Sequence, residues 1–110
     1  MNSSQGDTTF TDVTGLSFPT SNVRSARIDY TIFRFTDTNT VYEFGSLFIV
    51  YSPGNSVSQK WEVQRDFVGD GKVLFQVTDD GQVQYKITST IAGTNYQGKI
   101  GFRAMTILQA

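Results

Sequence analysis

The chain has 110 residues, no Cys, no His and a formal net charge of -1. This length suits one domain, and nine Phe and five Tyr residues are too many for a disordered chain. Without Cys and His the sequence excludes disulfides, thiolate or imidazole metal sites and a Ser-His-Asp triad, and its scattered Lys and Arg residues form no basic stripe that would bind nucleic acid.

The chain is expected to begin with a polar tether over residues 1–15, followed by a single β domain over residues 16–110. Its first residues, MNSSQGDTT, lack the basic start and the apolar run of a signal peptide. No segment approaches the roughly 20 apolar residues of a membrane-spanning helix. A short strand at Leu16-Ser17-Phe18 is expected to open the domain.

The segment from Val23 to Thr36 is predicted to be a long strand. Its side chains alternate with a period of two, which is typical of a strand that is buried on one face. The inner face is expected to carry Ala26, Ile28, Tyr30 and Ile32. Phe33 and Phe35 make the second face apolar near the end of the strand.

A second strand, Val41–Tyr51, is apolar on both faces. One face carries Leu47, Ile49 and Tyr51, and the other carries Tyr42, Phe44, Phe48 and Val50. A small two-layer domain has one interior, so the second set is predicted to form an oligomer interface. Two alternatives remain: coverage by the N-terminal segment with Phe10, Leu16 and Phe18, and a central strand covered wholly by its own chain.

Three further strands are predicted over Lys60–Val68, Lys72–Thr78 and Gln82–Thr90. A two-residue loop at Asp80-Gly81 would place apolar side chains opposite polar ones. A three-residue loop, Asp79-Asp80-Gly81, is preferred because it aligns apolar side chains across the hairpin. The aligned pairs are Val77 with Val83, Phe75 with Tyr85, and Val73 with Ile87.

The same reasoning at Gly69-Asp70-Gly71 predicts a second hairpin, and therefore a three-strand meander. In that register Phe67 lies opposite Val73, Arg65 opposite Phe75, and Val63 opposite Val77. With a last strand over Gly98–Gln109, the sequence predicts an all-β fold, an antiparallel β-sandwich, jelly-roll-like or meander, of about six to eight strands.

Carboxylates are the remaining candidates for catalysis or metal binding. Asp70, Asp79 and Asp80 lie beside glycines, as calcium ligands often do. Their spacing fits no EF-hand loop, and hairpin turns favour Asp and Gly at these positions. Glu62 and Asp66 fall on the polar face of a strand, where solvation explains them better than a glycosidase pair. We therefore predict no catalytic residue, no metal site and no cofactor.

Aromatic side chains near loops are the candidates for stacking against a sugar ring. The predicted ligand-binding residues are Tyr96, Asn95, Tyr42 and Asn39. Asn95 lies in the loop Ala92–Asn95 and Tyr96 follows it. Asn39 lies in the turn Asp37–Thr40, and Tyr42 lies near that turn. Trp61 and Tyr85 are excluded because the register places them in the core. Ordinary packing at strand ends is the competing interpretation.

The runs ARIDYTIFRFTDTNTVYEFGSLFIVY, WEVQRDF, GKVLFQVTDDGQVQYKITST and YQGKIGFRAMTILQA resemble the small C-terminal β-domains at the tips of bacteriophage tail fibres and related virion appendages. The resemblance covers about Val23 to Ala110. It implies a β-sandwich head, usually a homotrimer, that caps a fibre and contacts the host surface, often its polysaccharide. It carries no binding-residue motif over to this chain.

The leading hypothesis is a non-catalytic tail-fibre tip domain in the virion that forms homotrimers and contributes to recognition of host-surface glycans. Neither nucleic acid nor membrane insertion is expected. One alternative is a monomeric carbohydrate-binding module that uses Tyr42, Asn95 and Tyr96. A second is a purely structural capsid-decoration or fibre domain without a small ligand.

Overall fold

The computed structural model describes Gly6 and residues 9–52 and 60–108, and these residues form seven strands in two antiparallel sheets. The strands are β1 (Thr11–Ser17), β2 (Val23–Phe35), β3 (Thr40–Tyr51), β4 (Trp61–Gly69), β5 (Val73–Val77), β6 (Gln82–Ile87) and β7 (Gln97–Leu108). The predicted antiparallel β-sandwich is confirmed.

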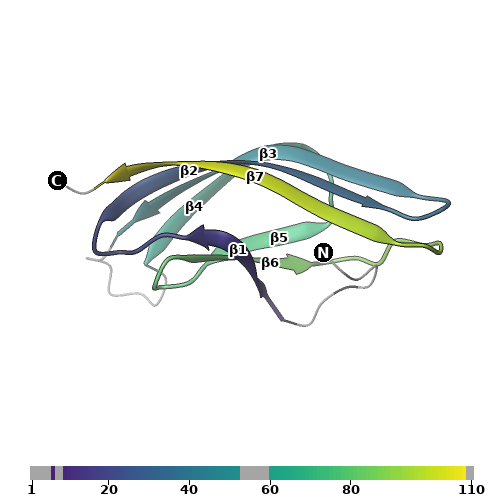
Figure 1. The fold of residues 1–110 in the computed structure, drawn as a ribbon, viewed down its shortest axis with the longest axis horizontal. Helices are drawn as coiled ribbons and strands as arrows, with labels where there is room; N and C mark the ends of the chain where they lie inside the picture. Colours follow the sequence, from purple (N-terminus) through teal and green to yellow (C-terminus); the bar gives the residue numbers. More distant parts are fainter. Residues whose placement is uncertain (1–5, 7–8, 53–59, 109–110) are drawn as a thin grey trace.

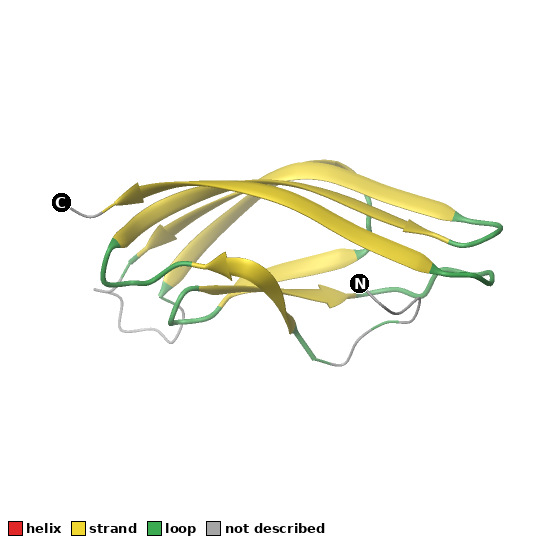
Figure 2. Cartoon of the chain, viewed as in Figure 1, coloured by secondary structure: helices red, strands yellow, loops and turns green. Residues whose placement is uncertain are grey.

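The two sheets form two layers of unequal width. One has the strand order β1-β6-β5, and the other has the order β4-β3-β2-β7. The longer strands of the four-stranded sheet arch over the narrower sheet (Figure 1). Figure 2 shows strands and connecting loops throughout the described chain. In the wider sheet β2, β3 and β4 follow one another as a meander, and β7 is added beside β2.

The core lies between the layers and contains alternate side chains of each strand. Its buried members include Ile28, Ile32, Leu47, Ile49, Trp61, Val73, Val77, Val83 and Ile87. Burying one such aliphatic side chain contributes about 1.5 to 3 kcal/mol. Trp61 belongs to this core as predicted, and the half-buried Tyr85 packs against it.

The β5–β6 hairpin has the predicted register. Val77 pairs with Val83, and Val73 pairs with Ile87. The three-residue loop is closed by a hydrogen bond from the Gly81 amide to the Thr78 carbonyl at 2.9 Å, and Gly81 has a φ of +94°. A Cβ at Gly81 would lie 1.9 Å from the Phe18 carbonyl oxygen, so both the turn and the neighbouring chain require glycine there.

The predicted hairpin between β4 and β5 is wrong. β4 pairs with β3 from Gly69 opposite Glu43 to Trp61 opposite Tyr51, and it belongs to the other sheet. The connection crosses between the layers, and it contains two residues with positive φ, Gly69 at +86° and Lys72 at +58°. The predicted alignments of Phe67 with Val73, Arg65 with Phe75, and Val63 with Val77 therefore do not form, and Phe67 is 47% exposed instead of buried.

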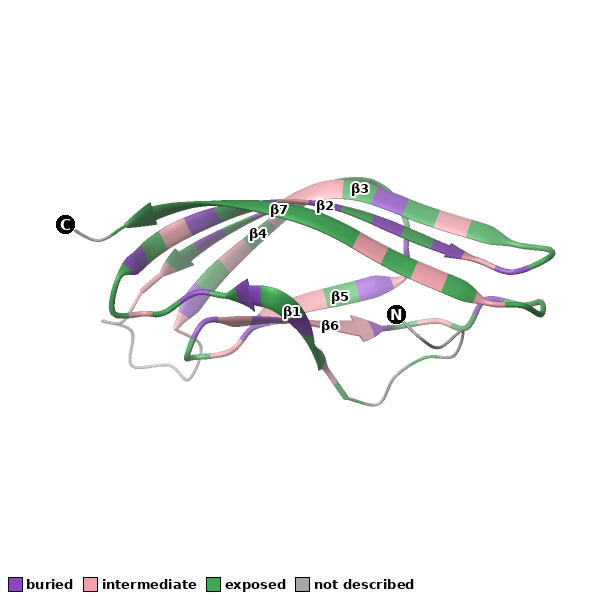
Figure 3. Cartoon of the chain, in the orientation of Figure 1, coloured by how far each residue is buried: buried purple, intermediate pink, exposed green. Residues whose placement is uncertain are grey.

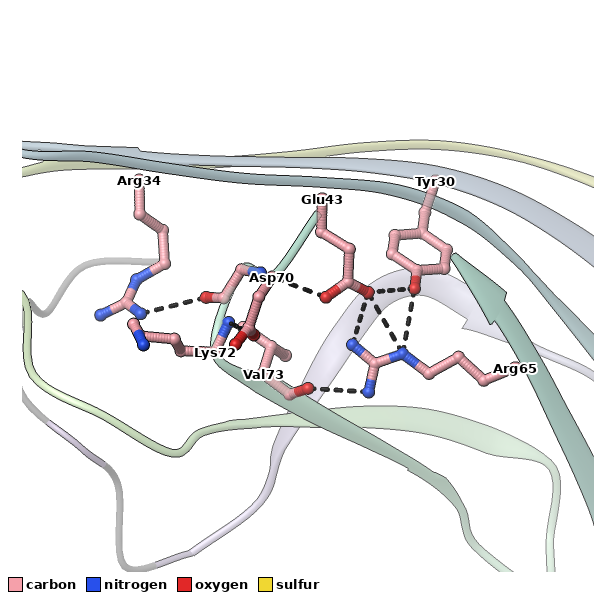
Figure 4. A network of polar contacts seen from close by, with 8 residues as sticks. Tyr30, Arg34, Glu43, Arg65, Asp70, Lys72 and Val73 are labelled. Carbon is pink, nitrogen blue, oxygen red and sulfur yellow. Dashed lines mark hydrogen bonds and ion pairs between the residues drawn. The ribbon is translucent and has the colours of Figure 1, made fainter. Parts of the chain in front are cut away.

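A buried polar network holds this crossing in place (Figure 4). Glu43 is fully buried on the inner face of β3 and forms an ion pair with Arg65 of β4. Arg65 Nε donates to Glu43 Oε2 at 3.2 Å and to the Tyr30 hydroxyl at 3.1 Å, and the Tyr30 hydroxyl donates to Glu43. Burial is the main cause that raises the pKa of Tyr30 above its usual range, and the hydrogen bond to Glu43 is the second. The Tyr30 hydroxyl therefore stays protonated and remains a donor.

The same network binds both backbone groups of the buried Gly71. Its amide donates to Glu43 Oε1 at 3.2 Å, and its carbonyl accepts from Arg34 Nη1 at 3.1 Å. Arg65 Nη1 also donates to the Val73 carbonyl at 2.8 Å, at the start of β5. Charged side chains of the four-stranded sheet therefore hold the chain where it enters the three-stranded sheet.

The N-terminal segment also differs from its prediction. β1 begins at Thr11, so the domain starts before the predicted boundary at residue 16; residues 1–5, 7 and 8 of the expected tether lie outside the described residues. β1 pairs with β6, and Leu16 and Phe18 are buried in the core. These two side chains therefore do not cover the second apolar face of β3.

The network generates a prediction about stability. We expect Glu43→Gln to lower the free energy of unfolding by about 3 kcal/mol, because it leaves the Arg65 charge inside the sandwich without its partner. Urea denaturation followed by Trp61 fluorescence measures this change. The matched control, Glu62→Gln on the exposed side of β4, is expected to change stability by less than about 0.5 kcal/mol.

A second variant separates loss of the charge partner from general damage. Glu43→Gln combined with Arg65→Met removes both charges, and we expect it to recover part of the lost stability. Equal destabilisation by Glu43→Gln and Glu62→Gln would contradict the role given to the network.

Candidate functional site

The face of the four-stranded sheet that points away from the core is the candidate site, and we call it the outer face. Along β3 it carries Tyr42, Phe44, Ser46, Phe48 and Val50. Along β2 it carries Ser25, Arg27, Asp29, Thr31 and Phe33. Along β4 it carries Glu62, Gln64, Asp66 and Val68. Along β7 it carries Lys99, Gly101, Arg103, Met105 and Ile107. Figure 3 shows exposed residues alternating with buried ones on β2 and continuous exposure over much of β7.

One apolar cluster lies on the outer face towards the β2–β3 turn. The rings of Phe33 and Phe44 are in edge contact at 5.5 Å between centroids, and Tyr42 lies 5.6 Å from Phe44. Val68 lies opposite Phe44 on β4 and is 71% exposed. The three rings lie close together, and all four side chains remain open to solvent.

A second apolar cluster lies towards the other end of the same face. Arg27 of β2 lies opposite Phe48 of β3 on one side and opposite Met105 of β7 on the other. The Arg27 guanidinium lies 5.6 Å from the centroid of the Phe48 ring. The neighbouring row contains Val50 and Ile107. Met105 and Ile107 are 60% and 66% exposed. The outer face therefore exposes large apolar side chains from several strands.

A polar row separates the two clusters. Asp29 accepts from the Ser46 hydroxyl at 2.7 Å and forms ion pairs with Arg27 and Arg103, each at 3.1 Å. These hydrogen bonds, with that of Ser46 the largest, lower the pKa of Asp29 to about 2. In the next row Gly101 leaves a shallow hollow beside Asp29 and Arg103.

The charges at the two edges of the outer face are opposite in sign. β4 carries Glu62 and Asp66 at one edge, and β7 carries Lys99 and Arg103 at the other. Exposed apolar clusters lie between them on β3 and β2. This arrangement of charge is complementary to that of a second copy whose edges are reversed.

The structure places each predicted oligomer-interface residue on the outer face. Tyr42 is 48% exposed, and Phe44, Phe48 and Val50 are each 41% exposed. The alternative in which their own chain covers them wholly does not hold for the described residues. Whether they contact another copy remains a prediction.

The structure brings three of the predicted ligand-binding residues to two neighbouring loops and places the fourth elsewhere. The side-chain nitrogen Nδ2 of Asn39 donates to the Ala92 carbonyl at 2.7 Å, which joins the β2–β3 turn to the β6–β7 loop. Asn95 is exposed in that loop with a φ of +57°. The Tyr96 hydroxyl accepts from Arg34 Nε at 3.0 Å beneath the same loop. Tyr42 points from the outer face instead and belongs to the first apolar cluster.

Comparison with known proteins finds no relative of this chain. No protein-family model matches it, and neither does any curated protein or solved structure. Over the described ranges there is no helix that could span a membrane. The described residues also contain no group of three or more carboxylates placed to hold a metal ion. The geometry of the outer face is therefore the basis for a function.

Sequence reasoning did not assign Phe33, Met105 and Ile107 to the outer face. Phe33 was visible as an apolar residue on the second face of its strand, and Met105 and Ile107 share one face of the last strand with Arg103. The alternation of side chains does not show which strands are neighbours in the sheet. The pairing of β7 with β2 brings residues 74 positions apart, such as Asp29 and Arg103, into one row.

The polar row leads to a testable pH dependence. Because folding lowers the pKa of Asp29, its contribution to stability is complete above about pH 5 and is lost as the pH falls towards 2. We expect Ser46→Ala to raise the pKa of Asp29, measured by carboxyl-carbon NMR titration. Thr31→Ala, one row away, is the control and should leave the titration unchanged. An unshifted titration in Ser46→Ala would contradict the assignment.

Proposed function

We propose that this chain is a non-catalytic assembly domain of a virion appendage, such as a tail-fibre tip, and that it forms a homotrimer through the outer face of its four-stranded sheet. The observation that carries the proposal is the exposure of Phe44, Phe48, Met105 and Ile107 on one sheet face. Monomeric proteins rarely leave such a face open to solvent. The resemblance of the sequence to virion appendage heads supports the biological setting.

The width of the sheet supports three copies. With strands about 4.8 Å apart, a four-stranded sheet is about 19 Å wide. Three such sheets can form a triangular prism whose outer faces point inward, and each sheet then lies about 5 to 6 Å from the axis. Sheets packed face to face are about 10 Å apart, so this distance matches one layer of side chains. Phe44, Phe48, Val50 and Met105 would fill the centre of the trimer, and Tyr42, which lies beyond the end of β4 beside the β2–β3 turn, would lie at its open end.

A role in glycan recognition is the second part of the proposal. It rests on the resemblance, together with the exposed ring of Tyr42 in a cluster of three aromatic side chains. Asn39 and Tyr96 already have polar partners within the fold. Tyr42 is therefore the first of the predicted ligand residues to test.

The trimer is tested with a charge placed in the second apolar cluster. We expect the unchanged protein to have three times the mass of one chain in light scattering at micromolar concentration, and Phe48→Glu to be a folded monomer. A buried unpaired carboxylate would oppose assembly strongly. The matched control is Leu74→Glu on the narrower sheet, where Leu74 is 48% exposed and trimers should persist.

Two results would contradict the trimer. One is a monomeric unchanged protein at high micromolar concentration. The other is equal loss of assembly in Phe48→Glu and Leu74→Glu, which would mean that the outer face is not the contact surface.

Glycan recognition is tested on an array of bacterial surface polysaccharides. We expect Tyr42→Ala to reduce the retained signal at least about tenfold, as loss of one stacking contact would. Tyr96→Phe, which keeps the ring, is the control and should bind as the unchanged protein does. Stable trimers that bind no polysaccharide would favour the purely structural alternative. A monomer that binds through Tyr42 would favour the carbohydrate-binding module.

A further inference from the structure

We infer that neighbouring copies in the assembly are held in register by an ion pair between Asp66 at the β4 edge of one copy and Arg103 at the β7 edge of the next. This inference rests on the proposed self-assembly through the outer face. It adds the contact that sets how the copies are aligned.

Asp66 and Arg103 lie in one row across the sheet. Asp66 pairs with Ser46, Ser46 with Asp29, and Asp29 with Arg103 in the successive ladders β4–β3, β3–β2 and β2–β7. The two residues are thus at the same height along the strands, at opposite edges. Three strand spacings, about 14 Å, separate them, so they do not pair within one chain.

A symmetry axis parallel to the strands preserves this height. Rotation about such an axis brings the β4 edge of one copy to the β7 edge of the next, and Asp66 then meets Arg103. An axis across the strands would instead place β4 on β4, with Glu62 and Asp66 of both copies close together. The opposite charges at the two edges therefore favour the first arrangement.

Both side chains are available for this contact. Asp66 is exposed and has no ion pair within the described ranges. The Arg103 side chain is 81% exposed, and its ion pair with Asp29 uses Nε. The terminal nitrogens of a guanidinium can bind a second carboxylate at the same time. The hollow at Gly101 gives space beside Arg103 for a side chain of the neighbouring copy.

The test uses charge reversal in the full chain. We expect Asp66→Arg alone and Arg103→Glu alone each to raise the concentration for half-assembly at least about tenfold, because each places like charges together at every contact. The combined variant restores opposite charges and is expected to return to within about threefold of the unchanged protein. Sedimentation velocity over a concentration series measures all four proteins.

Rescue in the combined variant identifies a contact between copies. The two positions are too far apart to interact within one chain, so damage to either single chain would persist in the combination. Arg103→Gln, which avoids a new carboxylate beside Asp29, is the milder second variant. It should weaken assembly without altering the circular dichroism of the fold.

Mixing the two single variants tests the threefold arrangement. In a closed pair each contact would join one variant to the other, so equimolar mixing would restore assembly completely. In a ring of three, one contact must join two identical variants and therefore two like charges. We expect mixing to leave assembly weaker than in the combined variant; full rescue as a species of two chains would overturn the threefold form of the inference.

The outcomes separate this inference from the proposed function. Trimers that persist in both single reversals would overturn the ion pair and leave the apolar interface standing. A monomeric unchanged protein would overturn both. Loss of assembly in the single variants without recovery in the combined variant would also overturn the pairing of Asp66 with Arg103.

Discussion

The ion pair of Glu43 with Arg65 is the interaction on which the arrangement of the sheets depends. Glu43 is fully buried, and its two oxygens contact Arg65, Tyr30 and the Gly71 amide. A buried carboxylate requires such partners, because desolvation would otherwise cost several kcal/mol. The network binds the backbone of Gly71, and Arg65 also binds the Val73 carbonyl. These contacts fix the chain where it leaves β4 in one sheet and enters β5 in the other.

This separation determines what the molecule presents to solvent. With β4 added to β3, the larger sheet has four strands, and its inner face covers the three-stranded sheet and the core. The second face of β3 then has no layer of the described chain over it. Apolar side chains from β3, β2 and β7 meet there, with acidic residues at one edge and basic residues at the other. One strand, β3, therefore carries both the buried Glu43 and part of the proposed assembly surface.

Local patterns predicted the parts of the fold that local chemistry decides. The β5–β6 register follows from a turn closed by Gly81 and from apolar pairs on both sides of it. Gly69-Asp70-Gly71 has similar composition, but its path is decided by Glu43 and Arg34, which are distant in sequence. Inward-facing positions occupied by Glu43 and Arg65 were the available signal, since charges on an apolar face require partners. The alternation of side chains along β3 was enough to place Tyr42, Phe44, Phe48 and Val50 on its second face. Placing the β7 side chains on the same face required knowing that β7 pairs with β2.

Under the proposal, other copies of the chain cover the outer face. Hydroxyl-radical footprinting across the assembly transition tests it most directly, because Met105 and Phe48 are both exposed in one chain and both react readily. We expect their modification to fall several-fold as the protein concentration rises, and that of Leu74 on the narrower sheet to stay unchanged. Equal modification of Met105 at all concentrations, or protection of Leu74 instead, would contradict it.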